Sequence, residues 1–213
     1  MTKMFKKFTA AAACAATLLL TGCATGPQKF AVSDHTIRSI LVVPAVNETT
    51  SVDADNLMNA MSTYTLAEGG YYVFPMDTVK YVLEAEGFYE PERMRELGPE
   101  KLAQLFDSDS VLFIKILHWD ATYAVLNTQT KIIAEYSFFK ADGTPIWSDK
   151  VTVAYNSNQN NSGGGLIGLI VEATVAAVNR AAPDYRIAAK QINTFAVRNW
   201  EPGPYRRVNA QKH

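Results

Sequence analysis

The chain is poor in the residues on which metal and redox sites depend. It has two cysteines and three histidines among 213 residues. No two of the histidines, His35, His118 and His213, have the spacing of zinc ligands. Cys14 lies in the leader segment described below, so only Cys23 remains after processing and no disulfide can form. We therefore predict no metal site and no cofactor, and a fold that is stabilised by packing alone.

The chain also has no large excess of positive or negative charge, and it has few long apolar runs. The formal net charge is −1, and it becomes −4 without residues 1–22, which carry three lysines and no acid. Without a basic excess there is no reason to expect nucleic acid as a partner. Beyond the leader, the longest apolar run is Leu166–Val178, which Gly168 and Glu172 interrupt. A membrane-spanning helix needs about 20 apolar residues, so we expect none after processing.

The first 23 residues have the order of a bacterial export signal. Three lysines precede an apolar run from Phe8 to Leu20, as in a secretory signal peptide. The segment ends in Leu20-Thr-Gly-Cys23, which resembles the bacterial lipobox, a site cut immediately before its cysteine. The resemblance implies that the sulfur of Cys23 carries a diacylglycerol and its amine an acyl chain such as palmitate. Each buried methylene contributes roughly 0.8 kcal/mol, so these chains would hold the protein on a membrane.

The residue after this cysteine predicts which membrane holds the protein. In the enterobacterial lipoprotein pathway, which the segment resembles, an aspartate there retains a lipoprotein in the inner membrane. Ala24 occupies the position, so we expect sorting to the outer membrane, with the protein on its periplasmic face. We divide the chain into a signal peptide (1–22), a lipidated tether (23–36), a folded domain (37–200) and a polar C-terminal tail (201–213).

Apolar patterning predicts a single α/β domain. Strands and helices alternate in the first half, where Ser39–Val46 is typical of a strand buried on both faces. In the second half, apolar and polar residues alternate, which favours antiparallel strands with one more solvent-exposed face. Asp142-Gly143 predicts a hairpin turn between two of them. The expected fold is a mixed β-sheet with helices packed on it. Strands are expected at 39–46, 71–75, 110–118, 122–126, 130–139 and 146–154, and helices at 53–67, 77–87, 91–97, 99–106, 166–181 and 183–198.

Helical spacing also predicts which side chains the helices bury. Leu57, Met61 and Tyr64 share one face of the first expected helix, and Asp53 or Asp55 would cap it. The buried face of the last helix is expected to contain Ile187, Ala188, Gln191, Ile192 and Phe195.

Two short patterns resemble ligand sites but have plainer explanations. Gly163, Gly165 and Gly168 fit the glycine spacing of a dinucleotide-binding loop. An Asn-rich linker separates them from the preceding strand and no strand follows, so we expect only a loop. Asp53 and Asp55 could form part of a calcium site, although acidic residues are common at the start of a helix.

His118, Asp120 and the aromatic residues support an alternative function. The two polar residues could form an acid–base pair at a strand edge, although such a pair is more often an exposed turn. Most aromatic residues are expected in the core, but those on a wetter strand face would form a protein-binding or sugar-stacking surface. The alternative is therefore a periplasmic enzyme or glycan-binding protein. The aromatic residues concerned are Tyr71, Tyr72, Phe74, Phe88, Tyr89, Phe113, Trp119, Tyr123, Tyr136, Phe138, Phe139 and Trp147.

Several sequence blocks resemble one family of bacterial lipoproteins. They are Ser39–Thr49, Gly70-Tyr-Tyr-Val-Phe-Pro75, Asp107–Leu126 and Pro145-Ile-Trp147. The family consists of outer-membrane lipoproteins of unassigned function, including a meningococcal vaccine-antigen type, and the resemblance covers about residues 35–200. More distantly, the chain is similar to the curli-secretion lipoprotein CsgG and to the N-terminal domain of TolB. These resemblances imply an α/β fold, no assigned enzymatic activity, and a role in envelope assembly or secretion.

We therefore expect an outer-membrane-anchored, non-enzymatic accessory lipoprotein of an assembly or secretion complex. Its expected partners are the membrane, through the lipid, and other envelope proteins, among them a curli-secretion-like lipoprotein or a second copy of itself. The run Leu166–Val178 is apolar around nearly its whole circumference, which is unusual for a surface helix. It is either a core helix or a contact helix for a partner, and the contact residues would be Leu166, Ile167, Leu169 and Ile170.

Overall fold

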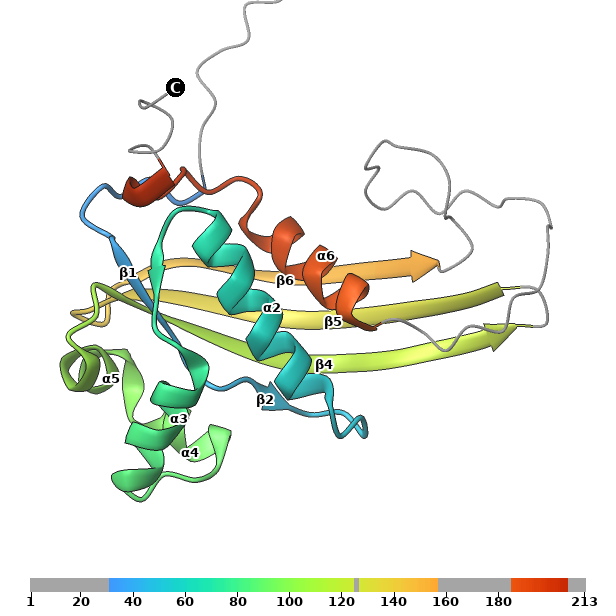
Figure 1. The fold of residues 1–213 in the computed structure, drawn as a ribbon, viewed down its shortest axis with the longest axis horizontal. Coiled ribbons are helices and arrows are strands. Elements are labelled where there is room, and N and C mark those ends of the chain that lie inside the picture. The colour runs from blue at the N-terminus through green and yellow to red at the C-terminus, as the bar shows by residue number, and fades with distance from the viewer. Residues whose placement is uncertain (1–30, 125–126, 157–184, 207–213) are drawn as a thin grey trace, which may run out of the picture. The chain divides into compact units, whose positions relative to one another are not determined.

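The computed structural model describes residues 31–124, 127–156 and 185–206. They form one unit with a mixed sheet and helices packed on both of its faces (Figure 1). Within these residues, no helix is both long enough and apolar enough to cross a membrane. In chain order the elements are β1 (Ser39–Val42), β2 (Val46–Asn47), α2 (Ala54–Glu68), β3 (Tyr72–Val73), α3 (Met76–Ala85), α4 (Pro91–Glu96), α5 (Gly98–Phe106), β4 (Ser110–Ala124), β5 (Asn127–Lys140), β6 (Pro145–Asn156) and α6 (Tyr185–Val197).

The sheet is mixed, as the patterning predicted. Its strand order is β3-β1-β4-β5-β6, and β2 also pairs with β4. The early strands β1, β2 and β3 pair in parallel, whereas β4, β5 and β6 form an antiparallel meander. A parallel pair needs a crossover connection, which α2 supplies between β1 and β3, whereas a meander needs only short turns.

Each face of the sheet has its own apolar core. On one face, α2 and α6 cover side chains that include Ile40, Ile114 and Tyr136. On the other face, α3, α4 and α5 cover Leu41 and Phe113, near the start of β4. Successive side chains of a strand point to opposite faces, so the apolar run of β1 is buried on both sides, as expected.

Pro44 divides the first expected strand. The run Ser39–Val46 was expected to be continuous, but β1 ends at Val42 and β2 begins at Val46. Proline has no N–H with which to continue a strand ladder. The amide of Ala45, next in the chain, donates instead to Oδ1 of Asn59, at 2.9 Å.

Both helices on the first face are rotated from their predicted orientation. In α2, Tyr64 is 45% exposed and Leu57 and Met61 are only partly buried. In α6, Ile187 is 39% exposed, although Ala188 and Ile192 are buried as expected. Besides Met58 and Leu66 of α2 and Ile192 of α6, the helices bury small and polar side chains, namely Ala54, Asn59, Ser62 and Thr65 in α2 and Ala188, Ala189, Asn193 and Ala196 in α6. Small side chains allow the two helices and the sheet to approach one another closely.

The antiparallel strands are longer than predicted. The expected strand at residues 122–126 is the continuation of β4, which reaches Ala124. The expected hairpin between β5 and β6 is present, but only Gly143 has a positive φ, of 81°, and Asp142 does not. The amide of Gly143 donates to the carbonyl of Lys140 at 3.0 Å, which closes the turn.

The folded unit is longer at both ends than residues 37–200. Val32, expected in the tether, is 2% exposed and forms a β-bridge with Trp200. The amides of Gly203 and Tyr205, expected in the tail, donate to the carbonyls of Gly69 and Gly70. The tether and tail predictions were therefore wrong for residues 31–36 and 201–206, because these polar segments form hydrogen bonds with each other and with the end of α2.

Candidate binding site at the joined chain ends

The N-terminal segment 31–36 and the C-terminal segment 199–206 are joined by their backbones, and we call this unit the end clasp. The amide of Ala31 donates to the carbonyl of Asn199 at 2.8 Å, and the amide of Glu201 donates to the carbonyl of Val32 at 2.9 Å. The bridge buries Val32 and leaves Trp200 6% exposed. The chain therefore enters the domain, from the predicted tether, directly beside the segment that follows α6.

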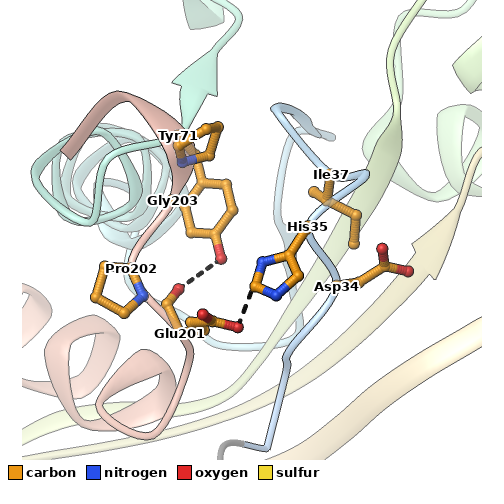
Figure 2. A pocket seen from close by; sticks show the side chains of 8 residues that line it. Asp34, His35, Ile37, Tyr71, Glu201, Pro202 and Gly203 are labelled. Carbon is orange, nitrogen blue, oxygen red and sulfur yellow. Dashed lines mark hydrogen bonds and ion pairs between the residues drawn. The ribbon is translucent and has the colours of Figure 1, made fainter. Parts of the chain in front are cut away.

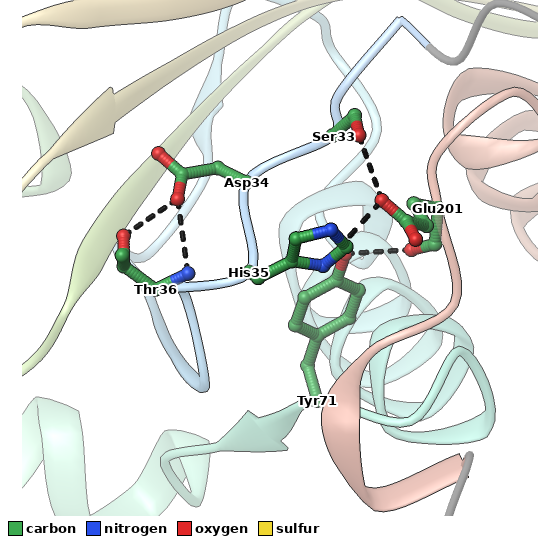
Figure 3. Close-up of polar contacts among 6 residues, drawn as sticks. All are labelled: Ser33, Asp34, His35, Thr36, Tyr71 and Glu201. Atoms are coloured by element: carbon green, nitrogen blue, oxygen red, sulfur yellow. Dashed lines mark hydrogen bonds and ion pairs between the residues drawn. The ribbon is translucent and has the colours of Figure 1, made fainter.

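Glu201 is the centre of the side-chain contacts in the end clasp (Figure 3). Its Oε2 accepts a hydrogen bond from Oγ of Ser33 at 2.7 Å and lies 3.7 Å from Nδ1 of His35. Its backbone carbonyl accepts a hydrogen bond from the hydroxyl of Tyr71 at 2.7 Å. Glu201 therefore links the N-terminal segment 31–36 to the turn between α2 and β3.

Asp34 attaches the N-terminal segment to the sheet at a second point. Its Oδ1 accepts hydrogen bonds from the amide of Thr36 at 2.9 Å and from Oγ1 of Thr36 at 2.6 Å (Figure 3). Its Oδ2 lies 2.7 Å from Nζ of Lys140, at the end of β5. The hydrogen bond from Lys140, followed by those from Thr36, holds the pKa of Asp34 well below its ordinary value. The carboxylate is therefore charged under all physiological conditions.

Two glycines let the C-terminal segment approach the end of α2. Gly70 has a φ of 94°, and a Cβ there would lie 2.3 Å from the Cβ of Arg206. A Cβ on Gly203 would lie 2.3 Å from the carbonyl oxygen of Gly70. No side chain fits at either position, so the close approach of residues 203–206 depends on this glycine pair.

A small hollow lies within the end clasp, between His35, Tyr71 and Pro202 (Figure 2). Its volume is about 20 Å³. That is close to the minimum space for a single water molecule. The hollow is therefore too small for an organic ligand.

A much larger groove, of about 420 Å³, lies beside the end clasp. Its walls are the last turns of α2 and α6 and the C-terminal segment. Its charged lining residues are Glu68, Arg198, Glu201 and Arg206, and its apolar ones include Leu66, Val197 and Trp200. The described lining thus combines apolar surface with two acids and two arginines, which suits a ligand that carries both apolar and polar groups.

An aromatic cluster supports one wall of this groove. Trp200 stacks on Phe138 with 4.6 Å between ring centroids, and it makes edge contacts with Trp147 at 5.2 Å and Tyr71 at 6.5 Å. Nε1 of Trp200 is buried and has no hydrogen-bond partner. Four packed rings make this wall rigid, because they have few alternative rotamers at such packing density.

The predicted site residues lie outside the described residues. This applies to the lipidation site Cys23, the sorting residue Ala24, and the contact-helix residues Leu166, Ile167, Leu169 and Ile170. It also applies to the glycine pattern at Gly163, Gly165 and Gly168. These predictions therefore stay predictions.

Other predicted residues lie within the described part of the chain. His118 and Asp120 lie on one face of β4, on either side of the buried Trp119. Asp53 precedes α2, but its side chain makes no capping hydrogen bond. Among the described residues, no three His, Cys, Asp or Glu side chains are grouped as metal ligands would be.

The expected aromatic surface is absent from the described parts of the meander. Trp119, Tyr136 and Phe138 are buried under α2 and α6, and Phe113 is buried on the opposite face. The most exposed tyrosines among the described residues, Tyr81, Tyr89 and Tyr205, lie outside the meander. The strand face that supported a glycan-binding function therefore offers no aromatic platform in the described residues.

Comparison with known proteins identifies the family. The model of the family described as "Putative lipoprotein GNA1162-like" matches residues 30–199. The chain belongs to the GNA1162-like lipoprotein family. It is 33% identical over 147 residues to "Putative lipoprotein NMB1124/NMB1162" of Neisseria meningitidis serogroup B (strain ATCC BAA-335 / MC58), covering 68% of this chain and 67% of that protein.

A solved structure from the same family supports the fold. The crystal structure of lipoprotein GNA1162 from Neisseria meningitidis is 34% identical, with a TM-score of 0.53, over 59% of this chain and 88% of that one. The single mixed α/β domain and the lipoprotein family are therefore confirmed, and membership supports a membrane-anchored location at the cell envelope. The distant similarity to CsgG and TolB stays a prediction.

The sequence did not indicate the residues that build the end clasp. Ser33 and His35 lie in a polar stretch, and Glu201 begins another, so both segments had the composition of linkers. Two signals were nevertheless available. Trp200 is a large apolar residue at the edge of the expected tail, and Gly70 precedes the Tyr-Tyr-Val-Phe block.

Proposed function

We propose that the protein is an outer-membrane-anchored lipoprotein that faces the periplasm and acts as a non-enzymatic binding component of an envelope assembly or secretion complex. The observation that carries this proposal is the groove of about 420 Å³ beside the end clasp. Its partner would be another envelope protein, bound through a short segment. The predicted resemblance to CsgG supports a role in assembly or secretion.

The groove has the size and the composition of a binding site. Sites for small molecules commonly measure about 300–1,000 Å³, and the groove lies within that range. Leu66 and Val197 offer apolar contact, while Arg198 and Glu68 can form charged hydrogen bonds with a polar segment. Charge on both sides of a groove favours one orientation of the bound segment.

A binding function fits this lining better than a catalytic one. The described lining contains no histidine, the side chain that most often serves as a general acid or base, and no cysteine nucleophile. Its hydroxyl side chains are Thr65 of α2, Thr194 of α6 and Tyr71, whose hydroxyl donates to the carbonyl of Glu201 at 2.7 Å. The hydroxyl of Thr65 donates to the carbonyl of Met61 at 2.7 Å, within its own helix.

Affinity purification tests the proposal. The full lipidated protein is purified from solubilised envelopes as wild type, as Thr194→Trp and as Gln104→Trp. Thr194 is exposed and lines the groove, whereas Gln104 is exposed on α5, on the opposite side of the sheet. We expect stoichiometric envelope proteins with the wild type and with Gln104→Trp, and their loss with Thr194→Trp. Retention of the same proteins by Thr194→Trp would contradict the groove as their site.

A further inference from the structure

Both acids that line the groove already have partners within the domain. Oε2 of Glu68 lies 3.8 Å from Nζ of Lys190 on α6. The carboxylate of Glu201 accepts the hydrogen bond from Ser33 and lies 3.7 Å from Nδ1 of His35 (Figure 3). The negative charges of the groove are therefore engaged by groups of this chain.

The two arginines that line the groove have no such partner. In the described part of the chain, neither Arg198 nor Arg206 forms an ion pair or a side-chain hydrogen bond, and both are exposed. The formal net charge of the whole chain is −1. The groove therefore carries local positive charge that the described residues leave available, on a chain without a basic excess.

The fold holds Arg206 at the groove through its backbone. The amide of Tyr205 donates to the carbonyl of Gly70 at 3.0 Å, and the amide of Gly203 donates to the carbonyl of Gly69 at 2.9 Å. The Cβ of Arg206 occupies the space that a side chain at position 70 would need. Arg206 is therefore fixed against the end of α2, although no acid of the described residues binds its guanidinium.

Arg198 is held in a different way. Its guanidinium carbon lies 3.7 Å from the centre of the Phe195 ring, one turn earlier in the chain. This cation–π contact is an electrostatic attraction to the ring face, and it leaves the N–H donors of the guanidinium for other partners. A carboxylate is the partner that this group binds best in proteins, through two parallel hydrogen bonds.

These observations indicate the charge of the occupant. We propose that the groove binds an acidic peptide segment, whose carboxylates pair with Arg198 and Arg206 and whose apolar side chains contact Leu66 and Val197. The inference rests on the proposed function and adds the chemical class of the partner. Complementary charge of this kind speeds association and excludes basic segments.

The polar lining favours a peptide over a lipid chain. The guanidinium groups could also bind the phosphate of an anionic lipid. The groove lining is not continuously apolar, however, because Thr65, Glu68 and Thr194 belong to it. An acyl chain gains nothing from these side chains, whereas a peptide backbone can form hydrogen bonds with the exposed Thr194.

Peptide binding tests the charge of the occupant. The full lipidated protein, in nanodiscs of phosphatidylcholine, is titrated against two labelled synthetic peptides, and fluorescence anisotropy reports binding. Leucine alternates with aspartate in one peptide and with asparagine in the other. We expect the aspartate peptide to bind more tightly, and its affinity to fall as salt is raised towards molar concentration.

Neutral variants of the arginines should weaken binding of the aspartate peptide. Arg198→Gln and Arg206→Gln should each reduce the affinity about fivefold, and the double variant about 25-fold. The matched control is Arg93→Gln, which removes an exposed arginine from α4 on the opposite side of the sheet and should have no effect.

Three results of this titration would overturn the proposal. They are equal affinity for the two peptides, an equal effect of Arg93→Gln, and displacement of the aspartate peptide by less dihexanoyl phosphatidylglycerol than unlabelled peptide. The last result would assign the arginines to a lipid phosphate.

Charge reversal in envelopes separates this inference from the proposed function. Purification of the double variant Arg198→Glu, Arg206→Glu should lose the same envelope proteins as Thr194→Trp. Cross-linking from position 194 of the wild type identifies the bound segment, and replacement of its acids by lysine should restore capture by the double variant. Loss of the proteins with Thr194→Trp but not with the double variant, or no restoration, would overturn the acidic segment and leave the groove as the site. Retention by both variants would contradict the groove itself.

Discussion

The Oγ atom of Ser33 donates a hydrogen bond of 2.7 Å to the carboxylate of Glu201, although 168 residues separate the two in the chain. Ser33 follows the predicted tether, and Glu201 follows α6. The N-terminal segment that follows the predicted anchor is therefore attached both to the wall of the groove, through Glu201, and to the sheet, through Lys140. The attachment of the domain and its candidate binding site are one structure.

Removal of the Glu201 carboxylate should loosen the entering chain. We expect Glu201→Ala to lower the free energy of unfolding by about 1 kcal/mol, because the hydrogen bond from Ser33 is lost. Hydrogen exchange at the amides of residues 31–36 should become faster, while exchange in β5 stays unchanged. The matched control is Glu92→Ala, which removes an exposed acid from α4. Unchanged exchange at residues 31–36 would show that Glu201 does not hold the segment.

Asp34→Asn should destabilise the protein in a pH-dependent way. The pKa of Asp34 is lowered in the folded state, chiefly by the hydrogen bond from Lys140. A lowered pKa contributes stability that is fully present above the unfolded value of about 3.9 and is lost as the pH falls further. Denaturant unfolding should show the variant below the wild type at pH 7, with a gap that narrows below about pH 4. A gap of constant size across that range would contradict the ion pair.

Gly143→Val should destabilise the hairpin between β5 and β6. Gly143 has a φ of 81°, which costs a residue with a side chain about 1–2 kcal/mol. A Cβ would also lie 2.8 Å from Oε1 of Glu100, although that side chain can move. Gly143→Asn is the control, because asparagine tolerates positive φ and should lose less. Equal midpoints for the valine variant and the wild type in chemical denaturation would contradict the turn geometry.

Cys23→Ala should abolish anchoring, because it removes the only thiol that remains after processing. The variant should incorporate no labelled palmitate and should not sediment with the outer membrane. Ala24→Asp is the matched control for sorting: it should still be labelled but should shift towards the inner membrane. Labelling of Cys23→Ala at the wild-type level would refute the lipidation site.

The sequence predicted the architecture well where the physical signal is local. Apolar runs and the alternation of apolar and polar residues predicted the strands β1, β5 and β6. Asp142-Gly143 predicted the hairpin between β5 and β6. The prediction of the buried face of α2 was wrong, because the spacing of the apolar residues favours Leu57 and Met61 on that face. The structure buries Met58 and Asn59 instead, and the side chain of Asn59 satisfies the amide beside Pro44.

The candidate site could not be predicted in the same way. The end clasp pairs segments at opposite ends of the chain, and each segment by itself has the composition of a linker. Their hydrogen bonds exist only once β5 and α6 have brought Asp34 near Lys140 and Val32 near Trp200.

Site-specific photocross-linking at Thr194 tests the central claim most directly. A photoreactive amino acid replaces Thr194 in the groove, or Gln104 on α5 as the control, and the full protein is irradiated in intact envelopes. The account predicts a discrete cross-linked envelope protein from position 194 and none from position 104. An identical pattern from both positions, or no product from position 194, would contradict the assignment of the groove as the binding site.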